Sequence, residues 1–220
     1  MKIGIDIRAI GRKRTGDEVY FFNLVKNLAE MDKESEYLLF TDRDPQKNPA
    51  LAEEIEKLEL ADNFQIIFLD SPSRFWWNLW ALPNYLRKSP VDIFHTQYIA
   101  PFWLPKNIKL ALTIHDISFN FFPQYIKKSD LFFLKVLIPK SIRRADKIIT
   151  VSQNEKKNIV GFYKIPAEKI DFAYNGVNFE RFNRKLSDAD IKKINTRYQI
   201  PDTKRSSSAS NSQKKNYTKI

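Results

Sequence analysis

Hydrophobic positions follow two different periods along most of the chain. Short apolar runs, such as 2–7 and 109–114, have the length and composition of buried strands. Longer segments between them place apolar residues three or four positions apart, and the stripe of Phe21, Leu24 and Leu28 is typical of an amphipathic helix. On this pattern we expect strands at 2–7, 36–41, 64–69, 91–95, 109–114, 147–151 and 170–174, and helices at 17–31, 50–59, 75–88, 129–144 and 152–162.

Strands that alternate with helices predict an α/β fold. Such connections make the strands parallel and place helices on both faces of the sheet. Two local signals support individual helices: Ser152-Gln-Asn-Glu155 has the form of a capping box at a helix start, and Pro139 predicts a kink within 129–144. Because ligands of an open parallel sheet bind beyond the carboxyl ends of its strands, we expect a site at those ends.

The two histidines of the chain close two of the predicted strands. His95 ends the strand 91–95, and His115 with Asp116 directly follows the strand 109–114. Titratable side chains at the edge where ligands bind indicate a site, and His115 and Asp116 are its best candidates. The alternative for each histidine is structural, with His115 capping local backbone and His95 packing within the sheet.

Composition narrows the class of protein. The 220 residues are 43% hydrophobic and 14% aromatic, which is typical of a globular protein with a sizeable core. No apolar run reaches the length of about 18 residues that a membrane span needs, and Asp6 interrupts the start where a signal peptide would be apolar. The absence of cysteine excludes disulfides and thiolate chemistry. We expect a soluble protein on the cytoplasmic side of the membrane.

The net charge of +11 is unevenly distributed. Residues 203–220 hold five basic side chains and no acid, so residues 1–202 carry the other six charges. A moderately basic domain favours phosphorylated ligands or an anionic membrane surface. Nucleic acid is the weaker alternative, because the sequence has no basic recognition helix. The Ser-rich, polar segment 201–220 is typical of a disordered tail.

Several common nucleotide and metal motifs are absent. Gly11 and Gly16 have the spacing of a P-loop, but the acidic pair Asp17-Glu18 replaces the Lys-Ser/Thr that would hold phosphate. The sequence contains no G-x-G-x-x-G after the first strand, no H-x-x-x-H and no G-x-S-x-G. A dinucleotide site, a zinc site and a hydrolase nucleophile elbow are therefore not predicted.

Three further features of the sequence allow alternative interpretations. The segment 74–88 contains three tryptophans between basic ends and predicts either a membrane-surface helix or, more simply, a core helix. Lys127-Lys128 and Arg143-Arg144 are interpreted as solvated helix ends, with contact to anionic lipid as the alternative. If the segment 74–88 is a core helix, the residues expected to face the sheet are Trp76, Leu79, Trp80, Leu82 and Tyr85.

Asp6 and Arg8 form either a plain surface ion pair or the border of the site.

Five segments in order resemble family 4 of the retaining glycosyltransferases with the GT-B fold, over about residues 1–200. They include the first strand and glycine-containing loop up to Thr15-Gly16, and the strand Val91-Asp-Ile-Phe-His95. The others are Thr113-Ile-His-Asp-Ile-Ser118 with Phe122-Pro123, Arg144-Ala-Asp-Lys-Ile-Ile-Thr-Val-Ser152, and Tyr174-Asn-Gly-Val-Asn178.

The resemblance implies a Rossmann-like, doubly wound domain that forms the acceptor side of an interdomain cleft. It implies a sugar transfer from a nucleotide-sugar, as co-substrate, to a glycan or lipid-linked acceptor, with no metal and with peripheral membrane contact as an option. His115 would approach the transferred sugar and the donor phosphate, and the loop between Gly11 and Gly16 would border the donor pyrophosphate. The implied site residues are His115 and Asp116 as catalytic, and Gly11, Thr15, Gly16, His95 and Asn175 as substrate-binding.

The sequence departs from the family pattern at two places. Asp17-Glu18 stands where a glycine and a small residue are usual, which bears on donor binding. After a domain at 1–200, the polar tail 201–220 follows where the donor domain is expected, so we expect a truncated or frame-shifted product that is inactive by itself. A non-catalytic module that binds a glycan or a partner is the alternative function.

Overall fold

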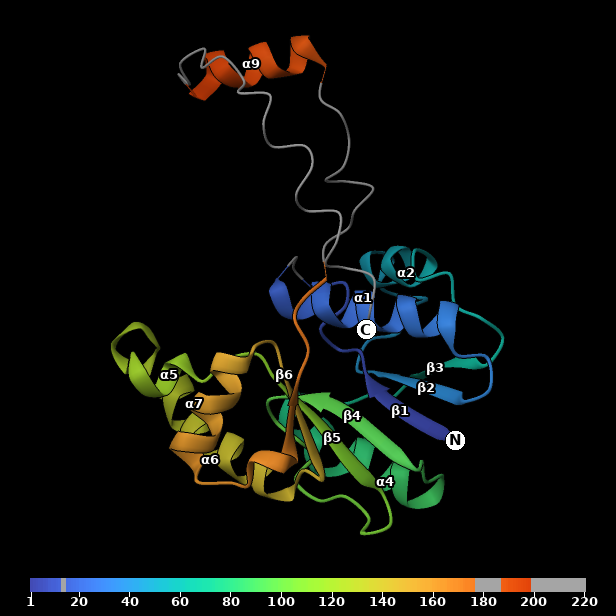
Figure 1. The fold of residues 1–220 in the computed structure, drawn as a ribbon. Helices are drawn as coiled ribbons and strands as arrows, with labels where there is room; N and C mark the ends of the chain where they lie inside the picture. The colour runs from blue at the N-terminus through green and yellow to red at the C-terminus, as the bar shows by residue number, and fades with distance from the viewer. Residues whose placement is uncertain (13–14, 177–186, 199–220) are drawn as a thin grey trace. The chain divides into compact units, whose positions relative to one another are not determined.

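The computed structural model describes residues 1–12, 15–176 and 187–198, and these build a seven-stranded sheet (Figure 1). All neighbouring strands are parallel, in the order β3-β2-β1-β4-β5-β6-β7. Because the order runs outward from the β1–β4 pair in both directions, the sheet is doubly wound and Rossmann-like, as predicted. The strands are β1 Lys2–Asp6, β2 Glu36–Thr41, β3 Phe64–Phe68, β4 Ile93–Gln97, β5 Lys109–Ile114, β6 Lys147–Thr150 and β7 Ile170–Phe172.

Helices cover both faces of the sheet and bury a separate apolar cluster on each (Figure 1). On one face, α1 (Gly16–Met31) packs Phe21 and Val25 against the strands, beside α2 (Pro49–Glu56). On the other face lie α4 (Leu82–Lys88), α6 (Lys128–Arg144) and α7 (Gln153–Tyr163). The short elements are α3 Arg74–Trp76, the π-helical turn η1 Trp77–Ala81, α5 Ser118–Phe121, and the 3₁₀ turns η2 Pro123–Tyr125 and η3 Ala167–Lys169.

The register of the central strands determines which side chains meet at the carboxyl edge. Ile5 of β1 pairs with His95 of β4, and His95 pairs with Ala111 of β5. The carboxyl ends of these three strands therefore lie side by side. A residue that follows β1 or β5 therefore lies at the same edge of the sheet, where α1 begins.

The strand predicted at 91–95 is displaced by two residues. Strand β4 begins at Ile93 and continues through Thr96 to Gln97, so His95 lies at its centre and not at its end. Val91 is buried as part of the core before the strand starts. The polar Thr96 continues the strand because its hydroxyl donates to the Asp6 carboxylate across the sheet, at 2.8 Å. That partner is distant in sequence, so the local pattern could not indicate it.

The tryptophan-rich segment also differs from its prediction. Instead of one helix at 75–88, the chain forms α3, the π turn η1 and α4. The π turn adds a residue to one turn and so rotates the buried face. Trp77 is consequently buried, whereas Trp76 and Trp80 are exposed over 51% and 61% of their surface. The expectation that Trp76 and Trp80 face the sheet is wrong for this reason.

A second unit begins after Asn175, and its described residues are Gly176 and 187–198. Its described part contains α9 (Asp188–Tyr198), which the apolar pattern did not predict. At the start of α9, the Ser187 hydroxyl donates to the Asp190 carboxylate at 2.7 Å. The predicted tail 201–220 lies outside the described residues. Within the described residues, no helix is both long and apolar enough to cross a membrane.

Gly4 provides a test of the packing between β1 and its neighbours. A Cβ at Gly4 would lie 2.9 Å from the Phe40 ring and 3.0 Å from the Phe94 ring, and both rings are fully buried. We expect Gly4→Ala to lower the free energy of unfolding by about 1–3 kcal/mol through overpacking. Gly161→Ala in α7, where nothing lies within 4 Å of the added Cβ, is the matched control.

The control should raise the stability by about 0.5–1 kcal/mol, because alanine favours a helix more than glycine does. Urea unfolding followed by far-UV circular dichroism measures both variants. Equal stabilities for the wild type and Gly4→Ala would contradict the close approach of the rings.

Candidate functional site

His115 is the first residue beyond β5, at the carboxyl edge of the sheet and against the first turns of α1. The ring of Tyr20 meets its imidazole edge-on at 4.8 Å between centroids, and Tyr98 lies at 5.6 Å. The Asp17 Oδ1 atom is 3.6 Å from His115 Nε2. The His115 side chain is only 13% exposed, and its Nε2 atom has no hydrogen-bond partner among the described residues.

Burial determines the charge of His115. Loss of solvent lowers its pKa below the ordinary 6.5, although the charges of Asp17 and Asp116 act in the opposite direction. The imidazole is therefore mainly neutral at neutral pH, with one nitrogen that donates and one that accepts. A neutral, nearly buried imidazole with an unpartnered nitrogen can donate a hydrogen bond to, or accept one from, a ligand at this edge.

Asp116 holds the loop that carries His115. Its carboxylate accepts the backbone N–H of Ser118 at 2.8 Å and the Ser118 hydroxyl at 2.5 Å. One residue later, the N–H of Ile117 donates to Glu155 Oε1 at 2.8 Å. Glu155 belongs to the predicted capping box, and Ser152 does cap α7 by accepting the N–H of Glu155. The Glu155 carboxylate reaches across to the His115 loop, a positioning contact that the local motif does not reveal.

The loop before α1 is held in place by a side chain of that helix. Gly11 has a φ of 73°, and an added Cβ would lie 2.8 Å from the Leu51 backbone, so only glycine fits. The Gly11 N–H donates to Glu18 Oε1 at 2.6 Å, and Glu18 is almost fully buried. Thr15 caps α1 through its hydroxyl, and Gly16 is the first helical residue, with open space around its Cα. Of the acidic pair, Glu18 thus braces the loop, whereas Asp17 lies near His115.

His95 lies deeper than the sequence suggested. Its Nε2 is 2.8 Å from the Thr113 hydroxyl, its ring packs against Phe21 at 5.2 Å, and the residue is only 8% exposed. Burial lowers its pKa to about 4, so His95 is neutral. This position, within the sheet and beneath the His115 edge, favours the structural alternative.

Asp6 and Arg8 form a buried network and not a surface ion pair. Burial raises the pKa of Asp6, but the charge and hydrogen bonds of Arg8, with the Thr96 hydroxyl, outweigh it and hold the pKa below its ordinary value. Arg8 binds both carboxylate oxygens, at 2.9 and 2.7 Å, and its guanidinium stacks 3.7 Å above the Trp77 ring. The pair lies on the face of the sheet opposite α1, because Asp6 alternates with Ile5 along β1.

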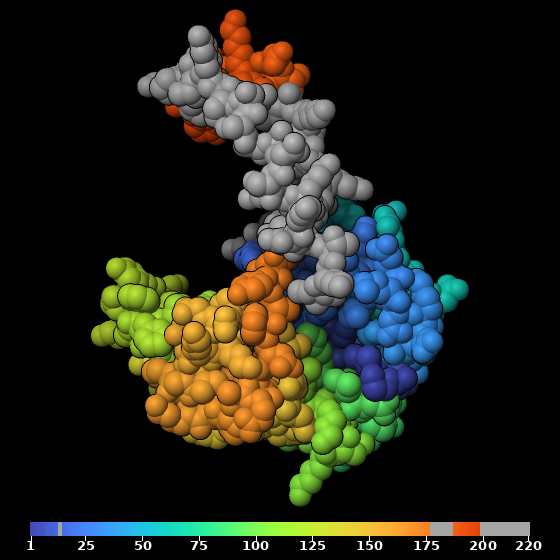
Figure 2. Space-filling view, viewed as in Figure 1, coloured from blue at the N-terminus to red at the C-terminus, as the bar shows by residue number. Residues whose placement is uncertain are grey.

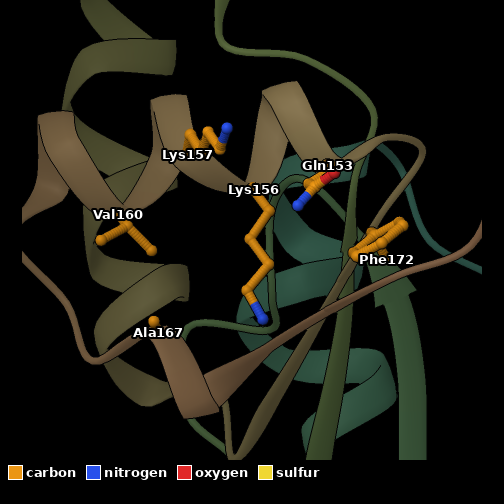
Figure 3. A pocket seen from close by; sticks show the side chains of 6 residues that line it. All are labelled: Gln153, Lys156, Lys157, Val160, Ala167 and Phe172. Atoms are coloured by element: carbon orange, nitrogen blue, oxygen red, sulfur yellow. The ribbon is translucent and has the colours of Figure 1, made fainter.

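The remaining predicted residue, Asn175, and the surface pocket of the structure add nothing to the contacts around His115. Asn175 is exposed and is the last residue of the first unit. A cavity of about 240 Å³ opens between α7, η3 and β7 (Figure 3). It is lined by Gln153, Lys156, Lys157, Val160, Ala167 and Phe172, and it contains none of the predicted site residues. Among the described residues, no three His, Cys, Asp or Glu side chains gather as a metal site would require.

The contact between Asp17 and His115 predicts that a change at Asp17 alters the pKa of His115. We expect Asp17→Asn to lower the pKa of His115 further, because the nearby negative charge that stabilises the imidazolium is removed. NMR titration of the His115 imidazole measures this directly. Glu36→Gln, which breaks only the contact with Lys2, is the control. A His115 pKa that stays constant or rises in Asp17→Asn would contradict the contact.

The sequence of this chain matches a known family. Residues 14–181 match the sequence profile of Glycosyltransferase Family 4. The O-antigen chain mannosyltransferase B of Escherichia coli is 27% identical over 184 residues, which cover 77% of this chain and 46% of that protein. The O-antigen chain mannosyltransferase RfbU of Salmonella typhimurium is 33% identical over 76 residues, which cover 34% of this chain and 21% of that protein. The chain thus spans less than half the length of these relatives.

Solved structures share the fold at low identity. A glycosyltransferase from Rickettsia africae superimposes with a TM-score of 0.54 at 22% identity, over 91% of this chain and 50% of that one. A UDP-GlcNAc 2-epimerase from Neisseria meningitidis, bound to UDP-GlcNAc, gives a TM-score of 0.54 at 10% identity, over 92% of this chain and 55% of that one. These similarities support the Rossmann-like fold. The sequence match covers most of the chain, and we conclude that the chain belongs to Glycosyltransferase Family 4.

Proposed function

We propose that this chain is the acceptor-side domain of a retaining GT-B glycosyltransferase, which transfers a sugar from a nucleotide-sugar to a glycan or lipid-linked acceptor. The observation that carries the proposal is the unpartnered Nε2 of His115 at the carboxyl end of β5. Family membership supports sugar transfer in general. The relatives named as O-antigen chain mannosyltransferases support a glycan acceptor and a role in polysaccharide biosynthesis.

The charges around His115 indicate which part of a donor it would meet. Asp17 lies 3.6 Å from Nε2, and its negative charge opposes a phosphate at that position. A sugar hydroxyl fits better, because it can donate to the Asp17 carboxylate and accept from the imidazole N–H at the same time. We therefore assign the pair His115–Asp17 to a hydroxyl of the transferred sugar. The hydrogen bond that the hydroxyl donates to the Asp17 carboxylate would stabilise the sugar as positive charge develops during transfer.

The remaining donor contacts would come from a second domain. The chain covers half of the solved glycosyltransferase and less than half of the curated relatives. We propose that the nucleotide-sugar binds between this domain and a donor domain outside residues 1–220, without a metal. We also propose that the reaction takes place in the cytoplasm at the inner face of the membrane. Asp116 and Glu155 would act as positioning residues, since both hold the loop of His115.

Titration of the purified chain tests the proposal. We expect oligosaccharides to shift the backbone NMR signals of the 115–118 loop and of the first turn of α1. Nucleotide-sugars should shift the same signals, and His115→Ala should weaken their binding severalfold, because the hydrogen bond to the transferred sugar is lost. Gln46→Ala, an exposed position before α2, should leave the binding unchanged.

We expect residues 1–220 alone to transfer no sugar from any nucleotide-sugar. Measurable transfer by the purified chain would contradict the incomplete site. If neither oligosaccharides nor nucleotide-sugars shift the loop signals, the alternative of a partner-binding module would replace the proposal.

A further inference from the structure

One surface outside the site carries an unusual number of exposed rings. Six aromatic side chains, each exposed over 47% or more, lie in the segment from α5 to η2, in the first half of α6 and at the end of α7. We call this surface the aromatic knob. In the space-filling view the yellow-green part of it stands out from the body of the first unit (Figure 2). Its residues are Phe121, Phe122, Tyr125, Phe132, Phe133 and Phe162.

The segments that carry these rings are packed on the core and tied to each other. Phe119 is buried beneath them, and Leu131 and Leu134 pack against the main core. Asn120 donates to the Tyr163 hydroxyl at 2.9 Å and ties α5 to α7. The rings also contact each other in pairs, with Phe121 against Phe162 and Phe132 against Phe133, both at 5.8 Å between centroids. Apolar surface of this extent on a soluble domain marks an interaction site.

The charge of the knob indicates its partner. Residues 121–140 contain four lysines, all exposed, and a single acid, Asp130. Lys127 and Lys128 lie between the rings of η2 and those of α6. Aromatic rings favour the interface between headgroups and acyl chains, and neighbouring lysines are attracted to anionic headgroups. An anionic bilayer satisfies both properties of this surface.

A second group of exposed aromatics lacks this combination. Trp76 and Trp80 are as exposed as the rings of the knob, and Phe75 contacts Phe102 at 5.3 Å. Residues 74–80 and 98–104 contain no lysine, and Arg74 is their only basic residue. That group therefore serves as an internal comparison, with apolar exposure but little positive charge.

We propose that the aromatic knob docks this protein onto an anionic lipid bilayer. The rings enter the interfacial layer, and Lys127, Lys128 and Lys135 contact lipid phosphates. Because Asp116 is hydrogen-bonded to Ser118 at the start of α5, the loop of His115 leads directly into the knob. Docking would thus bring the candidate site to the membrane surface. Its use for a lipid-linked acceptor rests on the proposed function, whereas the docking itself does not.

Vesicle sedimentation with the full chain tests the docking. Vesicles contain phosphatidylethanolamine with phosphatidylglycerol, or phosphatidylcholine alone. We expect Phe132→Ser with Phe133→Ser to reduce partitioning onto the anionic vesicles about tenfold, and Lys127→Glu with Lys128→Glu to reduce it similarly in low salt. The matched control, Trp76→Ser with Trp80→Ser, should bind as the wild type does. All variants keep the basic residues beyond 203, so those residues contribute equally.

A site-specific probe provides an independent readout, because the chain has no native cysteine. A Tyr125→Cys variant is labelled with an environment-sensitive fluorophore, and we expect the emission maximum of the label to shift to shorter wavelength when anionic vesicles are added. The same label on Gln46→Cys, in the loop before α2, should keep its emission maximum. Circular dichroism confirms that each variant is folded.

Three results would overturn the proposal. They are unchanged partitioning of the Phe132/Phe133 variant onto anionic vesicles, an equal loss of partitioning in the Trp76/Trp80 control, and an unchanged emission maximum of the Tyr125→Cys label. Self-association of the chain that is abolished by the Phe132/Phe133 change would instead assign the knob to a second copy. None of these measurements depends on sugar transfer.

Discussion

The buried carboxylate of Asp6 links segments of the chain that are far apart in the sequence. It accepts hydrogen bonds from the Arg8 backbone and guanidinium and from the Thr96 hydroxyl, which links the end of β1 to β4 and to the first loop. A buried charge is tolerated only with such complete pairing. Arg8 in turn stacks on Trp77, the buried tryptophan of the π turn. These contacts join the end of β1, the first loop and β4 at the carboxyl edge of the sheet.

The candidate site depends on two acidic side chains that do not themselves face a ligand. Glu18 braces the Gly11 loop from within α1, and Glu155 holds the Ile117 backbone from α7. With both loops fixed, His115 keeps a nearly buried nitrogen free at the sheet edge. Binding sites that are organised before the ligand arrives lose less entropy on binding. The contact of Glu155 with Ile117 also fixes the residue that precedes α5.

The sequence predicted the fold better than it predicted the contacts of its candidate residues. The strands 36–41 and 109–114 match their predicted bounds, because each is an uninterrupted buried run in a parallel sheet. The strand 91–95 was displaced, since the partner of Thr96 lies 90 residues away. For the same reason His95 lies inside the strand and not at its end. Trp76 is exposed because the π turn interrupts the ideal helical period on which its predicted burial depends.

By itself, the sequence determined the doubly wound α/β architecture, the position of His115 after a central strand and the order of the family motifs. These follow from local apolar periods and from the rule that parallel strands align their carboxyl ends. Only the tertiary structure decided that Asp17 faces His115, that Glu18 and Glu155 brace the two loops, and that His95 is buried. Those outcomes depend on side chains brought together from different elements, and a one-dimensional pattern does not contain that proximity.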